Sequence, residues 1–129
     1  MAPPAPESGT LDIEIAQLRS SKGMVRLCLT PDPSDFPDCR SGAHAIQRSY
    51  SAGTTHIRFE GVPPGTYALA VIHDENSNAR LDTFAGIPRE GFGFSRNPAI
   101  RFGPPRFASA SFAVGADPAK QQIRIRYLL

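Results

Sequence analysis

Tyr67-Ala-Leu-Ala-Val-Ile-His-Asp74 decides the fold, because this segment is apolar on both of its faces until its last two residues. In an extended strand, every second side chain from Tyr67 points to one face and the residues between them point to the other. A strand with two apolar faces belongs in the middle of a sheet that is covered on both sides. We therefore expect His73 and Asp74 at the end of a central strand, where a loop begins.

Other segments carry weaker strand signals, mostly an alternation of apolar and polar side chains. In the last of them, Ile123, Ile125 and Tyr127 are expected to point inward, and Arg124 and Arg126 outward. Thirteen prolines and eleven glycines punctuate the chain, and no long window has helical periodicity with matching caps. The additional strand segments are residues 11–15, 24–30, 43–51, 55–60, 108–114 and 121–129.

This pattern predicts an all-β fold: one antiparallel β-sandwich of about seven strands with one long ordered loop. A chain of 129 residues suits a single domain. We place the domain at residues 10–129, after a flexible leader at residues 1–9. A net charge of +2 is too small to indicate a nucleic-acid partner, and no apolar run reaches the ~18 residues of a membrane span.

The two cysteines, Cys28 and Cys39, flank a proline-rich segment. A disulfide between them would close a loop of about a dozen residues and contribute on the order of 3 kcal/mol. That interpretation favours a periplasmic or secreted protein, and residues 1–9 are read as the mature start of such a protein, without signal-peptide features. The alternative is a cytosolic protein with two free thiols. The three histidines lack the spacing of zinc ligands.

The segment after the central strand has the pattern of a calcium loop. Asp74, Asn76, Asn78 and Asp82 stand at positions 1, 3, 5 and 9, and the Arg80 carbonyl stands at position 7. Calcium prefers several oxygen ligands at about 2.3–2.6 Å, and alternating Asp and Asn side chains in a tight loop supply them. The sequence therefore predicts a Ca2+ site. The alternative is a turn in which these side chains cap their own backbone.

Two positions depart from the usual calcium loop. Ala79 stands where a sharp turn favours glycine, and Ala85 stands where a helical EF-hand carries its last acid. Glu90 is a candidate for an additional ligand from the following loop. His73 lies beside the loop, but no Ser/His/Asp or Cys/His set surrounds it. We therefore predict no catalytic residue and a protein that is not an enzyme.

Residues 84–107 contain five Phe, four Arg, four Gly and four Pro, and they show no periodicity. A connection of this length is usually functional, and its many Phe side chains indicate an ordered lobe beside the calcium loop. Arginine beside aromatic rings can bind an anion or a glycan. The alternative is that the Phe side chains anchor the loop and the guanidinium groups cover them. The candidate ligand-binding residues are His73, Arg89, Glu90, Phe92, Phe94 and Arg96.

Phe59-Glu-Gly-Val-Pro-Pro-Gly-Thr-Tyr-Ala-Leu-Ala-Val71 resembles prealbumin-like sandwich modules, which include carboxypeptidase regulatory domains and adhesin B-type repeats. The Asp74–Asp82 loop is similar to the calcium loop of those repeats. The resemblance implies an immunoglobulin-like or prealbumin-like sandwich.

A resemblance that covers nearly the whole chain rests on five segments. They look like a bacterial exported family, domain of unknown function 2141, which implies fold and compartment but no activity. We expect an exported binding or interaction module with a protein or glycan partner; the alternative is a carrier of a small ligand or glycan that uses the 84–107 loop. The five segments are residues 18–27, the strand that begins Pro63-Pro-Gly-Thr-Tyr67, and residues 73–82, 86–95 and 102–107.

Overall fold

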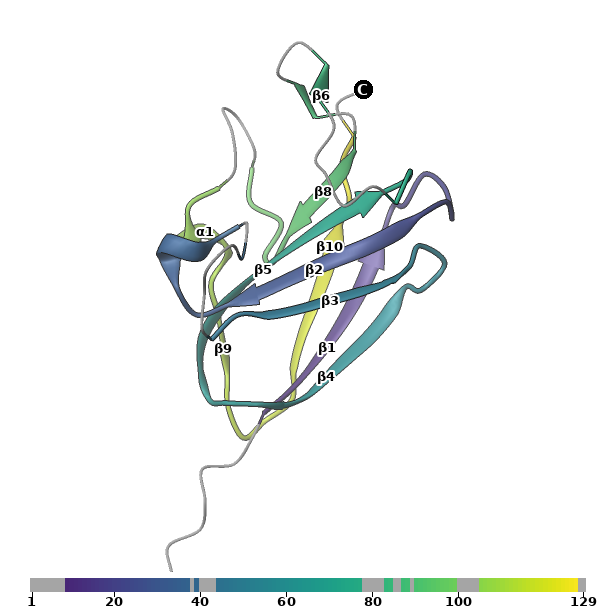
Figure 1. Cartoon of the computed structure of the whole chain (residues 1–129). Coiled ribbons are helices and arrows are strands. Elements are labelled where there is room, and N and C mark those ends of the chain that lie inside the picture. Colours follow the sequence, from purple (N-terminus) through teal and green to yellow (C-terminus); the bar gives the residue numbers. More distant parts are fainter. Residues whose placement is uncertain are drawn as a thin grey trace, which may run out of the picture.

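The computed structural model describes residues 9–37, 39, 44–77, 83–84, 87–88, 90–99 and 105–127. They form two β-sheets that pack face to face, so the predicted all-β sandwich is confirmed (Figure 1). The smaller sheet has the order β10 (Ala119–Arg124), β1 (Gly9–Ala16), β4 (His56–Val62). The larger has the order β3 (Ile46–Ser51), β2 (Met24–Thr30), β5 (Gly65–Asp74), β8 (Gly91–Phe94), and β9 (Phe112–Val114) pairs with the start of β5.

Short elements fill the connections. A 3-10 turn, η1 (Pro33–Asp35), follows β2, and a single helical turn, α1 (Phe107–Ala110), precedes β9. Strands β6 (Thr83–Phe84) and β7 (Ile87–Pro88) pair with each other as a small hairpin. No helix in the described ranges has the length and hydropathy needed to cross a membrane.

The core lies between the two sheets and is built by alternation along each strand. In β1, Leu11, Ile13 and Ile15 are buried, while the side chains between them reach the outer face. Burying one such side chain contributes about 1.5–3 kcal/mol. Strands β2, β4, β5 and β10 add further side chains of the same kind. They include Val25, Leu27, Leu29, Ile57, Phe59, Leu69, Val71, Ile123 and Ile125.

Strand β5 is central and covered on both faces, as predicted. Its Leu69 and Val71 face the core between the sheets, while Ala68 and Ala70 face a second apolar cluster on the outer side. That second cluster contains the disulfide between Cys28 and Cys39, whose Cα atoms are 5.9 Å apart. Because alanine is small, the covering segments approach this face of the strand closely.

Strand β10 departs from two predictions. The pairing of β10 with β1 is parallel, from Leu11 opposite Ala119 to Ala16 opposite Arg124, whereas an antiparallel sandwich was expected. The strand also begins and ends earlier than the predicted range of 121–129. Beyond it, Arg126 forms a bridge with Phe92 of the other sheet. Alternation reports which face a side chain occupies, but it carries no information on the direction of a partner strand.

The predicted strand at residues 108–114 is wrong in its first half. Phe107–Ala110 forms one helical turn, in which the Ser109 N–H donates to the Arg106 carbonyl at 3.0 Å. The Phe107 ring packs edge-on against Phe36, with centroids 6.1 Å apart, and thereby covers the second cluster. Only Phe112–Val114 is extended.

The segment predicted as one long loop contributes a strand to the larger sheet. In β8, Gly91 and Gly93 face the core, and a Cβ atom at either would lie 2.4–2.6 Å from Tyr127, Ile125 or Ile123. Glycine is therefore required at both positions, because the side chains of the C-terminal segment fill the space. The sequence pattern did not predict this strand, because glycine has a low strand preference and the position of the strand is set by packing.

Candidate functional site

The loop after β5 begins with a carboxylate that the fold holds in place. Asp74 is the last residue of β5, and its side chain is 1% exposed. Its Oδ2 accepts a hydrogen bond from Nε of Arg26, on the neighbouring strand β2, at 2.9 Å. The Ser77 N–H donates to the Asp74 carbonyl at 3.2 Å, so the chain turns at once. Asp74 and Asn76 thus lie at the entrance of the turn.

Part of the predicted calcium loop lies outside the described residues. Asn78, Arg80 and Asp82 belong to this part, as does the candidate ligand Arg89. Among the residues that the structure describes, no three His, Cys, Asp or Glu side chains gather so that they could hold a metal ion. More than half of the predicted ligand set consists of amide and carbonyl oxygens, from Asn76, Asn78 and Arg80. The calcium site therefore stays a prediction.

His73 is fully buried, and both of its ring nitrogens are engaged. Nε2 lies 2.8 Å from the Lys22 carbonyl, and Nδ1 lies 2.6 Å from the Tyr127 hydroxyl. A carbonyl only accepts, so we assign the ring proton to Nε2. In the neutral ring Nδ1 then accepts from the Tyr127 hydroxyl, whose oxygen accepts from the Arg19 N–H at 3.0 Å. The histidine ties three distant segments together.

Glu75 extends this network to the surface. Nε of Arg19 donates to Oε1 of Glu75 at 2.8 Å, and the Ser20 hydroxyl donates to Oε2 at 2.9 Å. The Arg19 guanidinium lies over the Tyr127 ring, 4.3 Å from its centroid. The hydrogen bond from Arg19 lowers the pKa of Glu75, whereas burial raises the pKa of the Tyr127 hydroxyl. We call the set Arg19, Arg26, His73, Asp74, Glu75 and Tyr127 the β5 rim.

Gly23 explains how the turn between β1 and β2 fits against this rim. Its φ is +73°, and a Cβ there would lie 2.0 Å from the Asp74 carbonyl oxygen. The turn therefore closes directly onto the end of β5. Sequence reasoning missed Lys22 and Tyr127 as partners of His73, because they lie 51 and 54 residues from it and share no local pattern with it.

The structure separates the other candidate ligand-binding residues. Phe94 is 8% exposed and packs against Phe36, with ring centroids 5.8 Å apart. Glu90 is buried at the start of β8. Phe92 is half-buried, and Arg96 is exposed on the turn that follows β8. Of the predicted set, Phe92 and Arg96 therefore reach the surface together, on an element next to β10.

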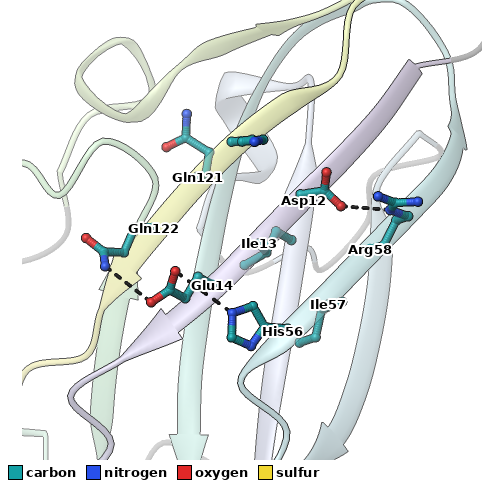
Figure 2. A pocket seen from close by; sticks show the side chains of 9 residues that line it. Asp12, Ile13, Glu14, His56, Ile57, Arg58, Gln121 and Gln122 are labelled. Carbon is teal, nitrogen blue, oxygen red and sulfur yellow. Dashed lines mark hydrogen bonds and ion pairs between the residues drawn. The ribbon is translucent and has the colours of Figure 1, made fainter.

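A polar hollow of about 510 Å³ lies on the outer face of the smaller sheet (Figure 2). Its carboxylates are already partnered: Asp12 Oδ1 accepts from Arg58 Nε at 2.8 Å. Glu14 accepts from Gln122 Nε2 at 3.4 Å, and its other oxygen lies 4.0 Å from His56 Nε2. The open, paired arrangement offers ordered donors and acceptors. Sequence reasoning did not single out this hollow, although the outward positions of residues 11–15 and 55–60 form most of it.

Comparison with known proteins gives one result. A family model described as "uncharacterized protein conserved in bacteria" matches residues 13–122. No curated protein and no solved structure matches the chain. The matched range runs from the second half of β1 into β10 and includes every residue of the β5 rim except Tyr127. The chain therefore belongs to DUF2141, a bacterial family of uncharacterized proteins.

Proposed function

We propose that this domain is a non-enzymatic, extracytoplasmic binding module whose residues 74–82 bind one calcium ion. The observation that carries the proposal is the position of Asp74. Its buried carboxylate stands at the end of the most enclosed strand, and the chain turns immediately after it. Position 1 of a calcium loop needs a carboxylate held in this way.

The Arg26 contact is compatible with a metal ligand. A carboxylate has two oxygens and about four lone-pair sites, so the same group can accept from Arg26 and ligate a metal ion. Arg26 also fixes the orientation of the Asp74 side chain before any ion arrives, which reduces the entropy lost on binding. The cost is repulsion between the guanidinium and the ion, which tunes calcium affinity downward. We expect a site that works at the millimolar calcium of an extracellular medium.

The disulfide supports the extracytoplasmic part of the proposal. Cys28 and Cys39 are bonded, and such bonds persist in oxidising compartments. The absence of a catalytic set in the described ranges supports the binding role. His73 has both nitrogens engaged, and the carboxylates of Asp12, Asp74 and Glu75 each pair with an arginine.

Thermal unfolding with and without calcium tests the proposal. At a calcium concentration ten times the Kd, binding adds about 1.4 kcal/mol, which is on the order of 5 °C in Tm for a domain of this size. We expect this rise with Ca2+ and a much smaller one with Mg2+. Asp82→Asn removes one ligand and should abolish the rise, whereas Asp117→Asn, in the turn before β10, should keep it. A Tm unchanged at 5–10 mM calcium would contradict the calcium site.

A second candidate function is carriage of a small ligand or glycan by the 84–107 segment. It is favoured by the exposure of Arg96 beside the half-buried ring of Phe92. Native mass spectrometry of protein isolated from the periplasm tests it. A co-purifying mass that disappears in a Phe92→Ala, Arg96→Gln variant supports carriage, and a bare protein mass counts against it.

A further inference from the structure

Two outward-facing arginines follow each other on and just after β10. Ile123 and Ile125 are buried in the core, so the residues after each of them, Arg124 and Arg126, project from the opposite face and are exposed. Two residues of extended chain span about 6.6–6.8 Å. The two arginine side chains thus leave the backbone on the same side of the segment. The Arg126 N–H donates to the Phe92 carbonyl at 2.8 Å, and the Phe92 N–H donates to the Arg126 carbonyl at 3.0 Å.

A third arginine is held beside them by an asparagine. Asn97 donates from Nδ2 to the Gln122 carbonyl at 2.7 Å and accepts at Oδ1 from the Arg124 N–H at 2.9 Å. These two bonds attach the turn after β8 to the edge of β10. Arg96 and Asn97 both have positive φ, 65° and 46°. The Arg96 N–H donates to Gln121 Oε1 at 3.0 Å, so a non-glycine turn in a costly conformation is fixed at this place.

Between these arginines lies an apolar floor. A shallow depression is lined by Phe92, Pro98 and Asn97 and flanked by Arg124 and Arg126. Phe92 is half-buried, packed 6.1 Å from the Phe94 ring, and therefore presents part of one face to solvent. We call Phe92, Arg96, Asn97, Pro98, Arg124 and Arg126 the arginine surface.

The charge of this surface is not balanced from within the part of the chain that the structure describes. Arg19, Arg26 and Arg58 each pair there with a carboxylate at hydrogen-bond distance. No described carboxylate lies within 4.0 Å of a guanidinium nitrogen of Arg96, Arg124 or Arg126. At the position opposite Arg124, the neighbouring strand β1 carries Ala16. Two exposed cations that line an apolar depression, with a third on the adjoining turn, are complementary to a ligand that combines anions with an apolar face.

We propose that the arginine surface binds an acidic polysaccharide through the carboxylates of its uronic acid units. Guanidinium groups recognise carboxylates with paired hydrogen bonds. The C–H face of a sugar ring matches the floor formed by Phe92 and Pro98. Such binding names a partner for the binding module proposed above, and it rests on that proposal.

Nucleic acid fits this surface less well. Binding of a single strand uses a series of open aromatic faces, but of the two rings that line the depression Phe94 is buried and Phe92 is half-buried. The disulfide favours a compartment that is rich in surface glycans.

Isothermal titration calorimetry with a hexameric oligogalacturonate tests the inference, with maltohexaose as the neutral control. We expect binding of the acidic oligomer alone, weakening as NaCl rises from 50 to 300 mM. Arg124→Gln combined with Arg126→Gln should reduce affinity on the order of ten-fold or more. Arg48→Gln removes an exposed arginine from β3, in the other sheet, and should change affinity less than about two-fold.

Three outcomes would overturn the inference: no binding of the acidic hexamer, an equal loss in the Arg48→Gln variant, or tighter binding of a thymidine hexanucleotide. The melting experiment on the same protein separates the two proposals. A calcium-dependent Tm without oligogalacturonate binding overturns the arginine surface alone. Binding without a calcium-dependent Tm overturns the calcium site alone.

Discussion

The β5 rim and the arginine surface both concentrate charge at the margin of the sandwich, but they treat that charge differently. In the rim, Asp74 and Glu75 are each held by an arginine from another strand or turn, and the partners of His73 are internal. In the arginine surface, the described residues provide backbone bonds that position the arginines but no carboxylate that neutralises them. The charged side chains of the rim pair with one another and hold chain segments together. Arg124 and Arg126 have no described carboxylate partner.

The largest effect that would sharpen this contrast comes from Gly91→Ala. A Cβ at Gly91 would lie 2.4 Å from the Tyr127 ring and 2.5 Å from Ile125, so the C-terminal segment must move away from β8. We expect a loss of about 3 kcal/mol in the free energy of unfolding, measured by urea denaturation. Gly53→Ala is the control: its Cβ meets no atom within 4 Å, and the change should stay within about 0.5 kcal/mol. Equal stability of the two variants would show that β8 and the C-terminal segment are not packed as described.

A smaller effect is expected from Asp74→Asn, measured in EDTA so that calcium plays no part. The substitution removes the charge that faces Arg26 at a site where the carboxylate is 1% exposed and the guanidinium side chain 32% exposed. We expect a loss of about 2 kcal/mol. The matched control is Asp12→Asn, which breaks the exposed pair with Arg58 and should cost less than about 1 kcal/mol. Equal losses of unfolding free energy in Asp74→Asn and Asp12→Asn would contradict the proposed difference between the β5 rim and an exposed ion pair.

The pH dependence of the rim gives a weaker signal. The hydrogen bond from Arg19 lowers the pKa of Glu75 in the folded state below its ordinary value of 4.5. A lowered pKa means that the ionised group stabilises the fold above the unfolded value and that this contribution is lost as pH falls through the folded value. Glu75→Gln should therefore lower Tm at pH 7 and have progressively less effect toward pH 3. A Tm difference that grows on acidification would contradict the assigned pairing.

The smallest effect is predicted for the arginine surface itself. Arg124→Gln with Arg126→Gln removes two exposed cations that no described carboxylate pairs with. Because their backbone bonds are unchanged, the free energy of unfolding should change by less than about 0.5 kcal/mol. Urea denaturation checks this. A loss above about 1.5 kcal/mol would place these residues among those that stabilise the fold, as in the rim.

The sequence predicts most where the signal is local. Two apolar faces identified β5 as central, and the position of Cys28 beside a proline-rich segment identified its bond with Cys39. The sequence did not predict strand β8, because Gly91 and Gly93 have low strand preference. Glycine is needed there because Ile123 and Ile125, about thirty residues further along the chain, leave no room for a Cβ atom.

The candidate site was predictable only in part for the same reason. The end of β5 at Asp74 is visible in the sequence, but the metal-ligand role of Asp74 and Asn76 stays a prediction. Tyr127 reaches His73, and Arg19 reaches Tyr127, through tertiary packing that no spacing in the chain reveals. The arginine surface depends on the parallel pairing of β10 with β1 and on the Asn97 bridge, both of which are non-local.

A crystal structure grown in millimolar calcium tests the central claim most directly, with anomalous scattering to identify the ion. The account predicts a calcium peak beside the end of β5, with six or more oxygen neighbours at about 2.3–2.6 Å that include the Asp74 carboxylate. A structure in which the Asp74 carboxylate meets only protein groups and no ion occupies residues 74–82 would contradict it.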